Sequence, residues 1–203
     1  MPAVEAQLAR FRAAHTQVLG VSVDSVHCHA NWAKDLGGIS FPLLADFNPK
    51  GAVARAYGAY LEQAGITDRA TVIIDSGGVV RHASSVTPAG QRDISQLAAL
   101  CEEIDRASAS PKEPFAEPPG VADGAVLYVK SRCGFSRATL LAMDNLHLAG
   151  RVQVTNITED AAAKEALVRV AGKETAPCLV LGGKPMHESK DIIRTLVEAT
   201  SPL

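Results

Sequence analysis

The sequence has little that would place it among membrane or nucleic-acid-binding proteins. Its apolar runs are far shorter than the stretch of about 20 residues that a membrane-spanning helix needs. Its 20 Lys and Arg residues are interspersed with 22 Asp and Glu residues, for a net charge of −2, so no basic surface is indicated. The first residues do not show the basic-then-apolar pattern of a signal peptide. We therefore expect a cytoplasmic protein with neither a nucleic-acid nor a membrane partner.

The sequence also has no paired-cysteine motif. None of its four cysteines (Cys28, Cys101, Cys133 and Cys178) forms a CxxC, and none stands with histidines at zinc-finger spacing. We therefore predict no metal site. In a reducing compartment these cysteines are free thiols, and only those in electropositive, partly exposed surroundings are reactive.

The pattern that is present is an alternation of helices and strands in two halves. Residues 106–123 are rich in Pro, Ala, Ser and Glu and are interpreted as a linker. The predicted domains are residues 1–105 and 124–203, each an α/β domain with a mixed sheet flanked by helices.

The predicted elements of the two halves follow nearly the same order. In the second half we expect strands at 126–129, 152–154 and 178–181, a fourth strand after the Gly182-Gly183 turn, and helices at 137–148, 160–170 and 189–198, with Ser189 as N-cap of the last. In the first half we expect helices at 2–14, 31–36, around 54–57 and at 93–104, and strands at 18–23, 70–75 and 79–83. Apart from an insertion, the first half repeats the second without its first strand, as two diverged copies of one topology would.

The stretch "VLYVKSRCGFSRATL" carries the clearest chemical signal. Cys133 stands where a predicted strand runs into a helix, and unpaired N–H groups and the positive dipole end of a helix favour a thiolate. Lys130 and Arg132 add positive charge. The alternative is a buried, inert cysteine.

Three segments of the second half, "YVKSRCGFSRA", "ETAPCLVLGGKP" and "HESKDIIRTL", resemble the glutaredoxin family over residues 121–197. The resemblance implies a thioredoxin-like fold in which Thr175-Ala176-Pro177 brings a cis-proline to face the active cysteine. It implies a glutathione site that includes Phe135 and Thr175.

In that site, backbone groups of Ala176 would pair with the peptide part of glutathione, and Lys130 would meet a carboxylate. The γ-glutamyl end would lie near Glu188 and Ser189, at a helix N-terminus suited to a carboxylate. Helix capping is the alternative role for Ser189.

CGFS itself resembles the monothiol glutaredoxins, many of which hold an iron–sulfur cluster. Only Ser131 and Arg132 separate Lys130 from Cys133, which is the shorter spacing of thiol-transferring members, and this favours redox chemistry. Because Ser136 replaces a second cysteine, turnover would proceed through a Cys133–glutathione mixed disulfide that a second glutathione resolves.

Two alternatives to redox chemistry at this motif remain open. Two Cys133 thiolates and two glutathiones would hold a [2Fe–2S] cluster across a dimer, or the chain would be a non-catalytic scaffold. Cys178 is either a resolving or regulatory thiol or a small apolar residue that begins a strand.

The segments "VLGVSVDSVHCHANWAKDLG", "FPLLADFNPKGAVARAYG" and "DRATVIIDSGGVVRH" of the first half resemble the alkyl-hydroperoxide-reductase branch of the peroxiredoxins over residues 1–104. The family's P-x-x-x-[ST]-x-x-C motif, which carries its peroxidatic cysteine, is absent. Arg69 matches the active-site arginine that supports the thiolate and polarises the peroxide. Its alternative is a surface ion pair with Asp68 or Asp75. Neither Cys28, which follows the "VSVDS" strand, nor Cys101, which we expect to face the core, replaces the missing thiol.

The first half also lacks the strand that would precede its first helix. In the topology that the two halves share, this strand is central. Its absence would leave two strand edges unpaired. Three hypotheses follow: the sequence is truncated at its start, which we favour, a segment of another chain fills the position, or the sheet has closed up.

Together the two resemblances predict an antioxidant peroxiredoxin–glutaredoxin hybrid. It would use glutathione as co-substrate to reduce disulfides, would form a homodimer in one possible arrangement, and would have little or no turnover of peroxides.

Overall fold

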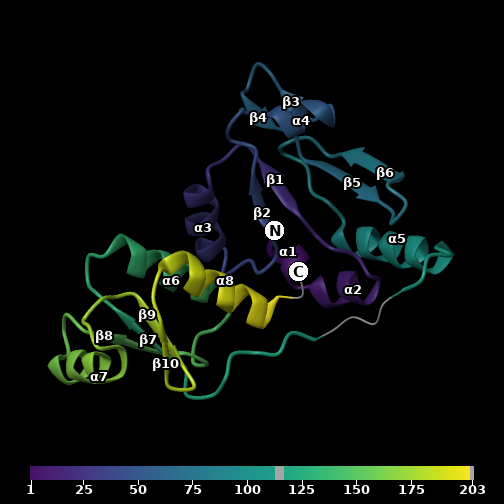
Figure 1. The fold of residues 1–203 in the computed structure, drawn as a ribbon. Helices are drawn as coiled ribbons and strands as arrows, with labels where there is room; N and C mark the ends of the chain where they lie inside the picture. Colours follow the sequence, from purple (N-terminus) through teal and green to yellow (C-terminus); the bar gives the residue numbers. More distant parts are fainter. Residues whose placement is uncertain (113–116, 202–203) are drawn as a thin grey trace. The chain divides into compact units, whose positions relative to one another are not determined.

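The computed structural model describes residues 1–112 and 117–201, which form two compact units (Figure 1). The first unit consists of residues 1–32 and 41–112, and the second of residues 33–40 and 117–201. Both are built from helices and strands, so the predicted α/β class is confirmed. Residues 113–116 of the predicted linker lie outside the described residues. No helix in the described ranges has both the length and the apolar character to cross a bilayer.

The second unit is organised around one mixed four-stranded sheet. Its strands are β7 (Val126–Val129), β8 (Gln153–Asn156), β9 (Cys178–Leu181) and β10 (Lys184–Met186), in the spatial order β10-β9-β7-β8. β7 runs parallel to β8 and antiparallel to β9, so the first strand is central. The predicted strands 126–129 and 178–181 are confirmed, whereas β8 lies one to two residues beyond the predicted 152–154.

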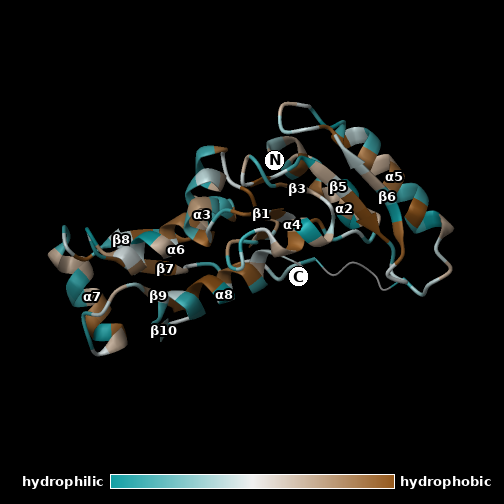
Figure 2. Ribbon diagram, turned by 90° about the horizontal axis from the view of Figure 1, so that it is seen from above, coloured by the Kyte–Doolittle hydropathy of each residue, from teal (hydrophilic) through white to brown (hydrophobic). Residues whose placement is uncertain are grey.

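Helices cover both faces of this sheet because β7 is apolar on both sides. Leu127 and Val129 point into a core shared with α6 (Gly134–Asn145) and α8 (Ser189–Thr200). Tyr128 points the other way, into a core shared with α7 (Ala161–Ala171). Hydrophilic and hydrophobic bands alternate along the α8 ribbon (Figure 2), because each turn of a helix with one buried side carries residues of both kinds.

The first unit contains shorter elements. They are α1 (Pro2–Glu5), α2 (Leu8–Ala13), β1 (Gly20–Ser22), α3 (Val26–Asp35), β2 (Leu43–Ala45), α4 (Ala52–Ala56), β3 (Tyr60–Leu61), β4 (Ile66–Thr67), β5 (Ala70–Ile74), β6 (Val80–Ser85) and α5 (Ile94–Ala107). The single helix predicted over 2–14 is wrong, because Gln7 leaves the helical conformation, with φ −116° and ψ 10°, and divides it into α1 and α2.

The strands of the first unit remain in separate two-stranded sheets. β1 pairs in parallel with β2, and β5 pairs antiparallel with β6. Among the described residues no strand joins β1 to β5 as β7 joins β8 to β9, so the hypothesis that the sheet has closed up is wrong. No residue of β1, β2, β5 or β6 is buried, whereas three of the four residues of β7 are. Two-stranded sheets are marginally stable alone, so the first unit depends on its helices.

Candidate active site

Cys133 stands at the N-cap of α6. β7 ends at Val129, and the three-residue connection that follows turns at Arg132, whose φ is +57°. Cys133 itself is extended, with φ −103° and ψ 117°, and Gly134 begins the helix. This geometry places the thiol beside the first N–H groups of α6, which lack partners within the helix.

The surroundings of Cys133 favour its thiolate. The Ser136 side chain contributes most to lowering the pKa of the thiol, by hydrogen bonding, followed by the backbone N–H groups of Ser136 and Phe135 and the charge of Lys130. Partial burial opposes these effects without reversing them. Because Cys133 is also partly exposed, it combines the two properties of a reactive thiol.

The other three cysteines differ from Cys133. Cys178 and Cys101 are buried, with exposed fractions of 0% and 3%, and desolvation raises the pKa of both thiols. The prediction that Cys101 faces the core is confirmed, and the burial of Cys178 agrees with its role as a small apolar residue. Cys28 is exposed on α3, with its Sγ 3.9 Å from an oxygen of Asp24.

Ser136 supports the site in a way that the sequence reading missed. Its side chain is buried, and its Oγ accepts a hydrogen bond of 3.1 Å from the backbone N–H of Lys130. The hydroxyl of Thr139, also buried, donates to the carbonyl of Ser136 at 2.8 Å. The serine that replaces a second cysteine therefore ties the connection before Cys133 to the first turn of α6.

A second missed group anchors Ser131 in the same connection. The amide of Asn156 donates to the hydroxyl of Ser131 at 2.8 Å, and that hydroxyl donates to Glu159 at 2.6 Å. The backbone N–H of Ser131 donates to the hydroxyl of Thr158 at 3.2 Å. These partners lie at the end of β8 or just after it, 25 to 28 residues away in the sequence, so the motif around Cys133 gives no signal for them.

The register of the sheet brings Thr175-Ala176-Pro177 to the Cys133 end of the unit. Cys178, which begins β9, pairs with Tyr128 near the end of β7. The residues just before β9 therefore lie at the edge of the sheet from which the chain leaves β7 toward Cys133. The Ala176–Pro177 bond is cis, as the glutaredoxin resemblance implies.

Glu188 and Ser189, the last two residues predicted to bind glutathione, also follow a strand that ends at the Cys133 edge of the sheet. Met186, at the end of β10, pairs with Leu179, so the chain leaves β10 close to the beginning of β9. Glu188 and Ser189 follow at the start of α8 (Figure 1). The predicted N-cap at Ser189 is wrong by one residue: Glu188 is the N-cap, with φ +66°, and Ser189 already belongs to the helix.

The predicted glutathione residues differ in exposure at this edge. Phe135 is 69% exposed, which leaves an uncovered aromatic ring two residues after the thiol. Lys130 and Ala176 are partly exposed, and Thr175 is exposed. Pro177 is buried. The edge thus carries a thiol of lowered pKa, an ammonium group, backbone groups and an exposed aromatic ring.

Arg69 is the candidate site residue of the first unit, and its contacts are not those of the alternative role, a surface ion pair with Asp68 or Asp75. Its guanidinium donates to the carbonyl of Gly90 at 2.8 Å, and Asp68 accepts from the backbone N–H of Arg69. Asp75 pairs with Arg81 at 2.6 Å. The ion pairs of the described residues thus do not join the side chain of Arg69 to Asp68 or Asp75.

A partly exposed thiol of lowered pKa at a strand-to-helix junction of a mixed sheet has the surroundings of a reactive cysteine. Residues 125–186 match the family model described as Glutaredoxin, and residues 1–83 match the model of the AhpC/TSA family. The first part of the chain is thus similar to the AhpC/TSA family and the second part to glutaredoxins.

Alkyl hydroperoxide reductases and peroxiredoxins are among the proteins similar to this chain. Alkyl hydroperoxide reductase E of Mycobacterium tuberculosis is 42% identical over 86 residues, which are 42% of this chain and 56% of that protein. Peroxiredoxin-4 of Bos taurus is 40% identical over 81 residues, 37% of this chain and 29% of that protein. Among solved structures, Mycobacterium tuberculosis AhpC aligns with a TM-score of 0.46 at 25% identity, over 50% of this chain and 61% of that one. The chain spans about half the length of the first of these relatives.

Proposed function

We propose that this protein is a glutathione-linked thiol–disulfide oxidoreductase of the peroxiredoxin–glutaredoxin hybrid type, with Cys133 as its reacting thiol. The observation that carries the proposal is the setting of Cys133, whose pKa is lowered by Ser136, the first N–H groups of α6 and Lys130, and whose sulfur is partly exposed. The nucleophile in thiol–disulfide exchange is the thiolate.

The proposed reaction has two exchange steps. In the first, the Cys133 thiolate attacks the glutathione sulfur of a mixed disulfide. A Cys133–glutathione disulfide forms, and the substrate leaves as a thiolate that takes up a proton. In the second, the thiolate of another glutathione attacks the glutathione sulfur bound to Cys133. This step releases oxidised glutathione and restores the Cys133 thiolate. Together, the mixed disulfide and one reduced glutathione give the substrate thiol and oxidised glutathione.

The residues at the Cys133 edge take the roles that their chemistry supports. Lys130 would hold a carboxylate of glutathione, and the backbone of Ala176 would pair with its peptide groups. Glu188 and Ser189, at the start of α8, would receive the γ-glutamyl end. Thr175, Pro177 and Phe135 complete the surface. Arg69 would polarise a peroxide in the AhpC/TSA region.

A coupled assay tests the proposal with glutathione, glutathione reductase and NADPH, using either a small glutathione mixed disulfide or hydrogen peroxide as substrate. We expect turnover of the mixed disulfide, loss of that turnover in Cys133→Ser and its retention in the matched control Cys178→Ser. Equal activity of the wild-type protein and Cys133→Ser would refute the assignment.

Cluster binding is the competing function, and it makes a different prediction. A [2Fe–2S] cluster has four ligands, usually thiolates, and Cys133 is the one cysteine of the second unit that is not buried. The remaining ligands would therefore come from glutathione and a second chain. Anaerobic reconstitution that yields a stable coloured dimer without disulfide reductase activity would support the cluster instead.

A further inference from the structure

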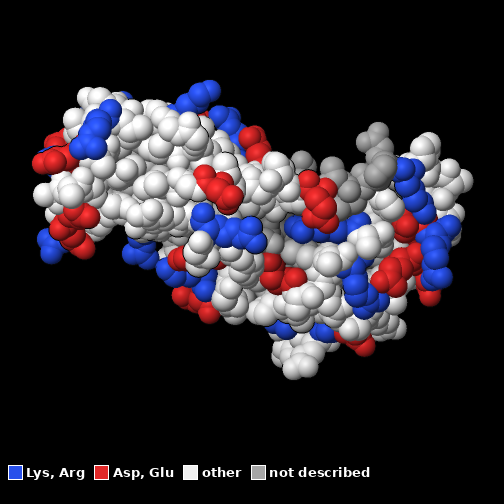
Figure 3. Space-filling view, turned by 90° about the horizontal axis from the view of Figure 1, so that it is seen from below, with Lys and Arg blue, Asp and Glu red and all other residues white. Residues whose placement is uncertain are grey.

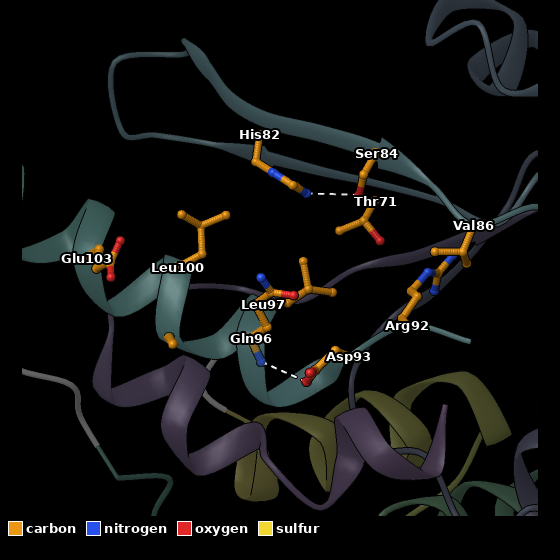
Figure 4. Close-up of a pocket in the computed structure, with 11 residues that line it drawn as sticks. Thr71, His82, Ser84, Val86, Arg92, Asp93, Gln96, Leu97, Leu100 and Glu103 are labelled. Carbon is orange, nitrogen blue, oxygen red and sulfur yellow. Dashed lines mark hydrogen bonds between the residues drawn. The ribbon is translucent and has the colours of Figure 1, made fainter. Parts of the chain in front are cut away.

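The first unit contains a cavity that the chemistry of Cys133 does not use. It has a volume of about 370 Å³ and lies between the β5–β6 hairpin and α5 (Figure 4). That volume falls within the range of about 300–1,000 Å³ that small-molecule sites occupy. None of its lining residues was singled out from the sequence.

One end of the cavity carries a cation with an unused hydrogen-bond donor. Nη2 of Arg92 donates to the carbonyl of Ala70 at 2.9 Å. Its Nε is sealed from solvent and has no partner within the described part of the chain. Leaving such a donor unsatisfied is costly, and more so on a charged group. Burial lowers the pKa of Arg92, and the charge of Arg69 lowers it further.

The charge of Asp68 raises the pKa of Arg92, but the ion pairs of the described residues do not join Arg92 to Asp68 or Asp93, and both carboxylates have other hydrogen-bond donors. Asp68 accepts hydrogen bonds from the backbone N–H of Arg69 at 2.8 Å and from the hydroxyl of Ser85 at 2.5 Å. Asp93 caps α5 by accepting from the backbone N–H of Gln96 at 2.9 Å. The Arg92 end of the cavity is therefore suited to an anion.

The rest of the cavity suits a peptide better than a purely apolar molecule. Leu97 and Leu100, three residues apart on α5, form an apolar floor, while His82 and Ser84 of β6 face them from the hairpin (Figure 4). Nε2 of His82 lies 2.9 Å from Oγ of Ser84, so both carry polar atoms that can meet amide groups.

The far end carries the opposite charge. Glu103 lines the cavity there, separated from Arg92 by the two leucines (Figure 4). The helix from its first residue to Glu103 spans about 14 Å at roughly 1.5 Å per residue. An extended peptide of about four residues has this length.

We propose that this cavity binds a short extended peptide with a free C-terminal carboxylate. The carboxylate pairs with the guanidinium charge of Arg92, an apolar side chain packs on Leu97 and Leu100, and the N-terminal ammonium group faces Glu103. The complementary charges at the two ends set the direction of the peptide.

Titration calorimetry on the full chain tests this with an alanine tetrapeptide that carries leucine at its second position. We expect the free acid to bind at least tenfold more tightly than its C-terminal amide. Arg92→Gln should remove this preference. The matched control is Arg81→Gln on the β5–β6 hairpin, where the arginine pairs with Asp75 and does not line the cavity.

Two further measurements keep the proposal testable if Arg92→Gln fails to fold, which circular dichroism would reveal. Glu103→Gln changes an exposed residue and should weaken the peptide with a free amino end but not its N-acetylated form. Equal binding of acid and amide, or no binding at millimolar peptide, would overturn the proposal. So would loss of binding in Cys133→Ser, because it would place the peptide at the thiol instead.

Discussion

Ser136→Ala is the most informative single change at the thiol. It removes the hydroxyl that contributes most to the lowered pKa of Cys133 and that accepts from the backbone N–H of Lys130 at 3.1 Å. We expect the pKa of Cys133 to rise toward its ordinary value. The partly buried N–H of Lys130 loses its partner, which costs about 1 kcal/mol. For a domain of about 100 residues this lowers Tm by about 4–8 °C.

The assay is the rate of Cys133 alkylation by iodoacetamide as a function of pH, read by mass spectrometry. Below both pKa values the variant should react more slowly, in proportion to its smaller thiolate fraction. Above both values the two rates should converge, or the variant should be slightly faster, because a thiolate of higher pKa is the stronger nucleophile. Differential scanning calorimetry measures the accompanying loss of stability.

Thr139→Val is the matched control. It removes a buried hydroxyl that donates to the carbonyl of Ser136 at 2.8 Å but is not among the groups that lower the pKa of Cys133. It should lose stability without moving the pH profile. The reasoning is refuted if Ser136→Ala leaves the profile unchanged, or if its rate falls by the same factor at every pH.

Four further predictions concern reactivity and stability. In the native protein at neutral pH, iodoacetamide should modify Cys133 well before Cys101 and Cys178, because the latter two are buried. Peptide mapping measures the labelling, and equal labelling of the three cysteines would contradict this prediction. Leu127→Ala, at a fully buried position of β7, should cost about 2–5 kcal/mol in denaturant unfolding; a loss below 1 kcal/mol (roughly one methylene) would contradict the assigned core. Asp160→Ala removes the side chain that accepts from the backbone N–H of Ala163 and caps α7, and should cost about 1 kcal/mol; an unchanged unfolding midpoint would exclude that cap. Because its folded-state pKa is lowered, the Cys133 thiolate should stabilise the protein relative to Cys133→Ser at high pH, an advantage lost as pH falls through the folded pKa; a pH-independent difference in Tm would be inconsistent with it.

The central elements of the second unit could be predicted because their signals are local. The runs VLYV and CLVL are apolar on both faces and are bounded by turn residues, as buried strands are. In the first unit the break at Gln7 follows no proline or glycine, and the β3–β4 hairpin has only two residues per strand. Both depend on packing that a sequence pattern does not record.

The candidate site divides in the same way. The position of Cys133 follows from the strand-to-helix pattern, because N-terminal N–H groups and neighbouring charges are properties of adjacent residues. The partners of Ser131 lie at the end of β8 or just after it, and the unused donor of Arg92 depends on which groups surround it after folding. A motif reading has no access to either.

The separate sheets of the first unit have a consequence for how its backbone exchanges hydrogen with solvent. The amides of β5 and β6 lie in a two-stranded ribbon without a buried residue, whereas β7 lies between two neighbours and is covered on both faces. Exchange from a ribbon of this kind proceeds through local opening, and exchange from a central strand requires opening of the whole unit. Deuterium should therefore enter the β5–β6 hairpin long before it enters β7, and a peptide bound between the hairpin and α5 would slow exchange from the hairpin but not from β7.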